Sequence, residues 1–164
     1  MTDDLTLVLT RHIKASPDTV YRCWTDAKLL PRWFAPDPVQ VVECDVDATP
    51  GGIFNVVMQM PGHDPMAAPA GCVLVADKGT RLVWTAALGP DFQPNPPHSN
   101  ADDFYMTADL RFEAEDGGCR YTVTARHATP EAKQAHEKMG FFTGWGTTTD
   151  QLAALAAKVD SDGV

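Results

Sequence analysis

Two polar residues of the sequence, Arg11 and His127, have the positions that acid-base chemistry on a small molecule would need. Arg11 shares strand parity with Ile13, and His127 shares it with Val123, so both side chains are expected to point inward. The two strands that carry them are expected to pair. An inward arginine needs an anion or another acceptor, and a histidine can take up or release a proton near neutral pH.

Arg11 and His127 also have a purely structural interpretation. Both lie at strand ends, where solvent or a structural acid can satisfy the guanidinium and where His127 can be solvated beside a helix cap at Thr129. In the chemical alternative, Arg11 binds a carboxylate or enolate and His127 acts as acid or base. The sequence has no G-x-S-x-G, Walker or G-x-G-x-x-G motif, so no reaction is assigned.

Residues typical of metal and redox sites are scattered along the chain. His63 and His98 lie on the proline-rich loops 61–69 and 89–100, which we expect at the same end of the domain, beside a pocket mouth. A metal site needs at least three converging ligands, so these histidines are expected to face solvent. The sequence predicts no metal and no cofactor. The cysteines form no C-x-x-C pair and are expected to be reduced, apolar residues: Cys23, Cys44, Cys72 and Cys119.

Large apolar side chains recur on the strand and helix faces that should point inward. The four tryptophans either line a site for a flat ligand or, for Trp33 and Trp145, anchor helices on the sheet. Several methionines either give an adaptable pocket or fill gaps in the core. The predicted pocket residues are Arg11, Phe54, Val56, Met58, Trp84, Met106, Ala108, Phe141 and Trp145.

The elements that position these residues form an α+β domain with an antiparallel sheet. A long C-terminal helix starts at Pro130, and Gly140, Gly144 and Gly146 predict a kink or break in it near Phe141. Period-two patterns and turn residues predict strands over 5–14, 39–45, 53–60, 71–77, 80–88, 104–113 and 119–127, with two short helices over 17–26 and 27–34.

The composition is that of one globular domain over residues 1–164, with a core from about 5 to 159. Of its 164 residues, 44% are hydrophobic and 21% charged. The formal net charge of -9 would repel phosphate backbones and anionic lipid surfaces, so we expect no nucleic-acid or membrane partner. The acidic N-terminus and the lack of a membrane-spanning apolar run predict a cytoplasmic protein.

Several motifs, taken in order, resemble one known family. They are Arg11-His12-Ile13-Lys14-Ala15-Ser16-Pro17, Leu30-Pro31-Arg32-Trp33-Phe34-Ala35-Pro36, Asp45 before Gly51-Gly52-Ile53-Phe54, Gly71, and Gly144-Trp145 followed by Leu152 and Leu155. Together they resemble homologues of the activator of the heat-shock-protein-90 ATPase, the Aha-type branch of the START-like (SRPBCC) helix-grip superfamily. The resemblance covers nearly the whole chain. It implies a seven-stranded antiparallel sheet wrapped around the C-terminal helix, with a cavity between them.

This resemblance implies a hydrophobic cavity but no single function. START-like domains bind lipids, sterols, polyketides or hormones, and some catalyse cyclisation or hydrolysis. Our first hypothesis is therefore a binding module for a small apolar or amphipathic molecule. The alternatives are a cyclase or hydrolase-like enzyme that uses the same cavity, and a protein-interaction role like that of a co-chaperone. We expect a monomer or homodimer.

Overall fold

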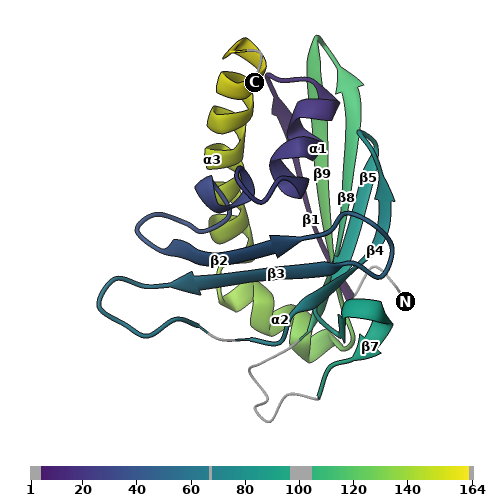
Figure 1. The fold of residues 1–164 in the computed structure, drawn as a ribbon, viewed down its shortest axis with the longest axis vertical. Helices are drawn as coiled ribbons and strands as arrows, with labels where there is room; N and C mark the ends of the chain where they lie inside the picture. The colour runs from purple at the N-terminus through teal and green to yellow at the C-terminus, as the bar shows by residue number, and fades with distance from the viewer. Residues whose placement is uncertain (1–4, 67, 97–104, 163–164) are drawn as a thin grey trace.

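The strands of the protein form one strongly curved antiparallel sheet (Figure 1). The computed structural model describes residues 5–66, 68–96 and 105–162. The sheet has seven strands in the order β1-β9-β8-β5-β4-β3-β2, which confirms the predicted helix-grip architecture. These strands are β1 (Thr6–Ile13), β2 (Gln40–Val46), β3 (Ile53–Gln59), β4 (Gly71–Asp77), β5 (Arg81–Thr85), β8 (Met106–Glu115) and β9 (Gly118–His127).

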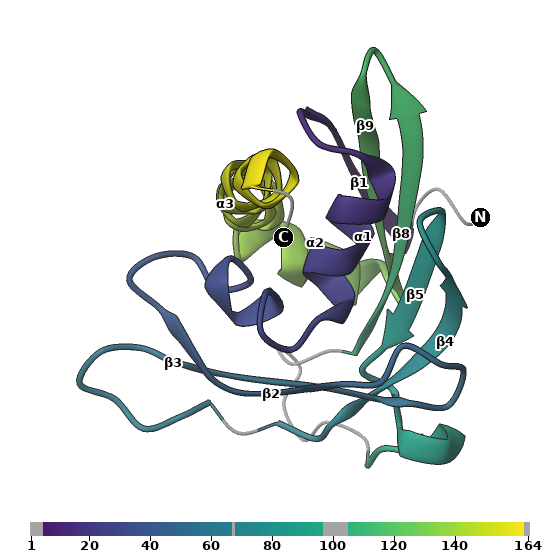
Figure 2. The same cartoon turned by 45° about the horizontal axis from the view of Figure 1, so that its top comes forward.

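The curvature of the sheet creates a concave side that holds the helices. Figure 2 shows β2 and β3 running nearly crosswise to β1, β8 and β9, with the helices inside the angle. The register places small and branched inward residues beside one another, as in Leu9 opposite Val123 and Ala108 opposite Ala125. All four are buried, so the period-two alternation of these strands generates the core.

The first helix, α1 (Pro17–Thr25), begins as its sequence predicts. The Ser16 hydroxyl accepts a hydrogen bond of 3.2 Å from the Thr19 backbone N–H, and Pro17 occupies the first turn. The predicted second helix over 27–34 is wrong in extent, because only the 3-10 turn η2 (Leu30–Arg32) forms. Pro31 lacks the N–H that a continuing helix needs, and its ring obstructs the preceding turn.

The C-terminal helical region consists of two helices. They are α2 (Pro130–Lys138) and α3 (Phe141–Asp162), and the chain turns between them at Gly140, whose φ is 95°. This left-handed backbone suits glycine, since a side chain there would be strained. The predicted break near Phe141 is therefore confirmed, whereas Gly144 and Gly146 remain helical. The break lets α2 and α3 cover different parts of the sheet.

The predicted strand 80–88 is interrupted after Thr85. A small second sheet follows, made of β6 (Leu88–Gly89) and β7 (Gln93–Pro94) around the 3-10 turn η3 (Pro90–Phe92). This turn contacts the start of β3, because the Asp91 N–H donates a 2.8 Å hydrogen bond to the Gly51 carbonyl. No helix in the described part of the chain is long and apolar enough to span a bilayer.

The two proline-rich loops have different relations to the interior. The chain from Met66 runs back along β3, with a 2.7 Å hydrogen bond from the Met66 N–H to the Met58 carbonyl. Ala68 and Pro69 then line the main cavity, but no described residue of the loop 89–100 does so. The second loop nevertheless lies against the end of the first, because the Asn95 amide donates a 2.9 Å hydrogen bond to the Ala70 carbonyl. The two loops therefore lie side by side as predicted, while the position of the second at the pocket mouth stays a prediction. His98 lies outside the described residues.

Candidate ligand-binding site

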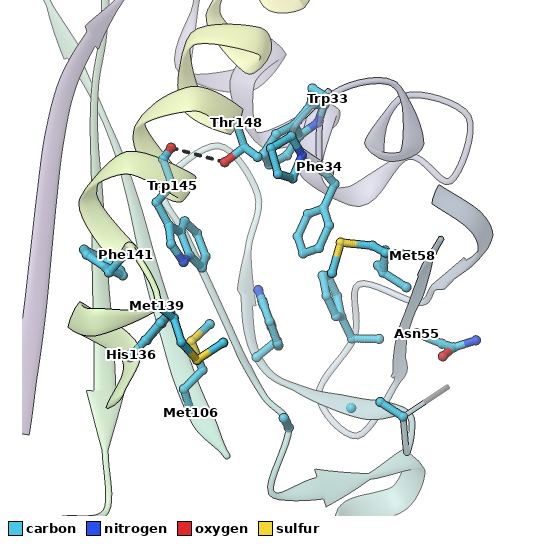
Figure 3. Close-up of a pocket in the computed structure, with 18 of the residues that line it drawn as sticks. Trp33, Phe34, Asn55, Met58, Met106, His136, Met139, Phe141, Trp145 and Thr148 are labelled. Atoms are coloured by element: carbon cyan, nitrogen blue, oxygen red, sulfur yellow. Dashed lines mark hydrogen bonds between the residues drawn. The ribbon is translucent and has the colours of Figure 1, made fainter. Parts of the chain in front are cut away.

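A cavity of about 450 Å³ lies between the concave side of the sheet and the C-terminal helices (Figure 3). The sheet contributes side chains from β3, β5 and β8, while η2 and its flanking residues, α2 and α3 close the other sides. Figure 3 shows Trp33, Phe34 and Met58 on one side and Met106, Met139 and Phe141 on the other. The size lies within the range of roughly 300–1,000 Å³ that is usual for small-molecule sites.

Stacked aromatic rings form much of the cavity wall. Phe54 of β3 and Trp84 of β5 stack with ring centroids 4.2 Å apart and planes 12° from parallel. Trp24 of α1 lies behind them, fully buried, and its ring centroid is 6.3 Å from that of Trp145. The Trp24 indole N–H donates a 3.0 Å hydrogen bond to the Tyr121 hydroxyl, which fixes the ring against β9. Elements far apart in sequence thus hold one rigid aromatic surface.

The helix side of the cavity depends on a missing side chain. Gly144 lines the cavity within α3, and a Cβ atom placed on it would meet no atom within 4 Å. Its backbone is helical, so no unusual φ angle requires glycine at this position. A glycine inside a helix costs roughly 1 kcal/mol relative to alanine. Because Gly144 has no side chain, the space beside Trp145 in the cavity stays open.

Two polar side chains of the wall already have protein partners. The Thr148 hydroxyl donates a 3.1 Å hydrogen bond to the Trp145 carbonyl, which is the dashed line in Figure 3. The Asn55 amide donates to Glu43 at 3.2 Å, and Figure 3 shows this amide directed away from the other labelled residues. These donor groups are therefore used within the protein, while the Thr148 oxygen can still accept a hydrogen bond.

The Trp84 indole differs from these side chains. Trp84 lines the cavity and is 8% exposed. Its nitrogen Nε1 is buried and has no hydrogen-bond partner within the described part of the chain. Buried N–H groups are nearly always paired, so this one is a candidate donor to a bound molecule, which would reach it only when the atoms that cover the nitrogen move.

A pair of histidines forms the polar edge of the cavity. His127 Nδ1 lies 2.9 Å from the Leu5 carbonyl, so it must donate, and His127 Nε2 lies 2.9 Å from His136 Nδ1. In the neutral pair, His136 therefore donates to His127. Burial, together with the nearby His127, lowers the pKa of His136 to about 4. His136 lines the cavity and is consequently uncharged at neutral pH.

The structure places most of the predicted pocket residues on the cavity wall. Ala108 faces inward but is fully buried outside the cavity, because Ala125 and Trp84 flank it on the neighbouring strands. The cavity is lined by Phe54, Val56, Met58, Trp84, Met106, Phe141 and Trp145 of the predicted set. Contact of these side chains with a ligand stays a prediction.

Arg11 does not lie where the sequence placed it. Its side chain is exposed, one guanidinium nitrogen donates a 3.0 Å hydrogen bond to the Thr10 carbonyl, and the other lies near Gly146. In the sheet Arg11 is opposite Tyr121, six residues before His127 on β9, which corresponds to about 20 Å along the strand. The inferred acid-base pair of Arg11 and His127 is therefore not formed.

Some residues of the cavity had no counterpart in the sequence-based prediction. His136 and Met139 reach the wall because α2 ends at Gly140 and the chain changes direction there. Trp33 and Phe34 reach it because the segment after α1 is a short turn and not a helix. A sequence pattern that predicts a continuous helix indicates neither the change of direction at Gly140 nor the short turn after α1.

Comparison with known proteins agrees with this architecture. The family model described as "Activator of Hsp90 ATPase homolog 1-like protein" matches residues 14–157. No protein with a curated description matches the chain. Protein NE0264 from Nitrosomonas europaea is 36% identical, with 99% of each chain covered and a TM-score of 0.88.

More distant structures share the same fold. Protein Ms6760 from Mycobacterium smegmatis is 25% identical, with a TM-score of 0.73 over 94% of this chain and 92% of that one. A protein from Rhodobacter sphaeroides is 21% identical, with a TM-score of 0.78 over 95% and 94%, which shows the fold alone. On the extent of the family match, this chain belongs to the Activator of Hsp90 ATPase homolog 1-like family.

Proposed function

We propose that the protein is a cytoplasmic binding module for a small apolar molecule, which it holds between the sheet and α3. The observation that carries this proposal is the cavity of about 450 Å³, whose wall is mostly apolar and rich in aromatic and methionine side chains. Each Å² of apolar ligand surface removed from water contributes roughly 25 cal/mol. A ligand enclosed in this cavity would therefore be held chiefly by apolar burial.

The methionines of the wall suit a site that adapts to its ligand. Met58 and Met106 come from the sheet, and Met139 lies at the end of α2. Unbranched thioether side chains change rotamer at little cost and pack well against aromatic rings. The rigid aromatic surface and the adaptable methionines together favour a planar apolar ligand over a long flexible one.

The enzyme and co-chaperone alternatives have less support from the geometry. The proposed acid-base pair is separated by about 20 Å along the sheet, which is beyond the reach of concerted proton transfer. A co-chaperone role would depend on an exposed contact surface for a partner protein, whereas the volume of this apolar cavity is that of a small-molecule site. We therefore favour the binding module.

Native mass spectrometry of the protein purified from its own host tests the proposal. We expect a bound mass that is lost on denaturation. Gly144→Leu should greatly reduce this bound fraction, because its side chain enters the open space of the cavity. Thr147→Leu, at an exposed position on the same helix, should keep it. Ligand-free spectra for the wild type, together with no uptake of added apolar compounds, would contradict the proposal.

A further inference from the structure

The described part of the cavity wall carries no charge. Among the described residues that line it there is no aspartate, glutamate, lysine or arginine. The ionisable His136 has a pKa lowered to about 4 by burial and by the neighbouring His127, so it is neutral under physiological conditions. A charged ligand group would lose its hydration here without meeting an opposite charge.

The wall nevertheless offers a specific hydrogen-bond donor. The buried Trp84 Nε1 has no partner among the described residues, whereas Thr148 and Asn55 donate to groups of the protein. An unpaired donor in a low-dielectric site favours any ligand that brings an acceptor, and penalises an analogue that lacks one. The donor therefore distinguishes between ligands of the same shape.

The surroundings of Trp84 also define the shape of the ligand. Its indole stacks on Phe54 in nearly parallel planes, and Phe34 packs edge-on against the same phenylalanine. All three side chains line the cavity. Ring surfaces arranged in this way pack best against another flat ring, by offset stacking or edge contacts.

We propose that the ligand is an uncharged planar ring compound with a hydrogen-bond acceptor, such as a ketone oxygen, that binds Trp84 Nε1. This inference rests on the proposed binding function and goes beyond it, since apolar burial alone does not require an acceptor. It makes Trp84 the residue that determines specificity.

Titration calorimetry with three probes of similar shape, at pH 7.5, tests the proposal. The probes are naphthalene, which has no acceptor, 2-acetylnaphthalene, which has a neutral acceptor, and 2-naphthoate, which is charged. We expect the ketone to bind about 10-fold more tightly than naphthalene, the effect of one good hydrogen bond. The carboxylate should bind more weakly than naphthalene.

Two matched variants test whether the preference for the ketone over naphthalene depends on Trp84. Trp84→Phe keeps a ring against Phe54 but removes the N–H, so the ketone and naphthalene should bind with equal affinity. Trp145→Phe removes the other indole N–H of the described wall and should keep the preference, and a preference lost in this variant instead would overturn the assignment to Trp84. The ratio of the two affinities is compared within each variant, so that a general loss of packing cancels. Circular dichroism verifies that both variants fold.

The possible outcomes separate the two claims. Equal binding of all three probes to the wild type would overturn the inference and leave the binding function intact, and so would a preference that persists in Trp84→Phe. Binding of none of them would count against both. If Trp84→Phe does not fold, the indole N–H signal of Trp84 in the wild-type NMR spectrum decides, since it should move downfield with the ketone and not with naphthalene.

Discussion

His127 Nε2 lies 2.9 Å from His136 Nδ1, and this contact joins the end of β9 to the cavity-lining face of α2. His127 is held in turn by the Leu5 carbonyl at 2.9 Å. A chain of hydrogen bonds therefore runs from the start of β1 to the cavity edge. It fixes the donor and acceptor roles of both rings as long as the pair is neutral.

The first prediction concerns the protonation of His136. An NMR titration of its ring should give a pKa of about 4, because burial and the neighbouring His127 both oppose the charge. In His127→Gln the pKa should rise but remain below the ordinary value near 6.5, since burial persists. A wild-type pKa near 6.5 would show that the ring is solvated and not part of the cavity edge.

This shift has a consequence for stability. The folded-state pKa of His136, about 4, lies below the unfolded value near 6.5, so the unfolded chain binds the proton more tightly. The contribution of the neutral ring is present above about pH 6.5 and is lost as the pH falls toward 4. Urea unfolding should show a loss on the order of 1–3 kcal/mol over that window, which is reduced in His136→Gln.

A second prediction concerns Asp109, which is buried on the outer face of the sheet. Arg81 donates two hydrogen bonds to it, at 3.1 and 3.0 Å, and Arg126 donates one at 3.2 Å. Burial alone would raise the pKa of Asp109, but these arginines outweigh it and hold the pKa below the usual range. Asp109→Asn should cost about 1.5–3 kcal/mol at pH 7.

The pH dependence of that cost identifies its origin. Because the folded-state pKa of Asp109 is depressed, its contribution is present above the unfolded value near 4 and is lost as the pH falls through the folded pKa. The difference between wild type and Asp109→Asn should therefore shrink below pH 4. Glu113→Gln, at an exposed position of the same strand, should have little effect at any pH. A constant difference down to pH 2 would rule out the ionic origin.

A third prediction distinguishes two tryptophans that the sequence treats alike. Trp33 is 2% exposed and donates a 2.9 Å hydrogen bond to the Cys23 carbonyl, so Trp33→Ala should cost about 3–5 kcal/mol. Trp145 is only partly buried and faces the cavity, so Trp145→Ala should cost less, about 1–3 kcal/mol. Chemical denaturation measures both. Equal losses would mean that Trp145 packs as a core residue.

The alternation of strand residues predicted much of the cavity wall. Phe54, Trp84 and Met106 each occupy the inward parity of a strand, and that parity is fixed by backbone geometry. The parity of a residue determines the face of the sheet on which its side chain lies, but not whether the end of a long side chain is buried. Arg11 has the inward parity of Ile13, yet its long side chain extends beside Gly146 and its charged end remains exposed.

The remaining residues of the site depend on tertiary structure. His136 becomes a partner of His127 only because Gly140 adopts a left-handed conformation and turns α2 away from the axis of α3. The glycines predicted a break in the helix, but the direction of the chain after the break depends on packing against the sheet. The sequence therefore predicted the fold and the sheet side of the cavity better than its polar edge.

The central claim, that the cavity between the sheet and the helices binds an apolar ligand, is tested most directly by NMR of methyl-labelled methionines. Met58, Met106 and Met139 line the cavity, although Met139 is itself 72% exposed, whereas Met60, which is 41% exposed, does not line it. On titration with 2-acetylnaphthalene, the account predicts saturable shifts of the three cavity methyl signals and little change at Met60. Shifts confined to Met60, or no saturable shift at the three cavity methyls, would contradict it.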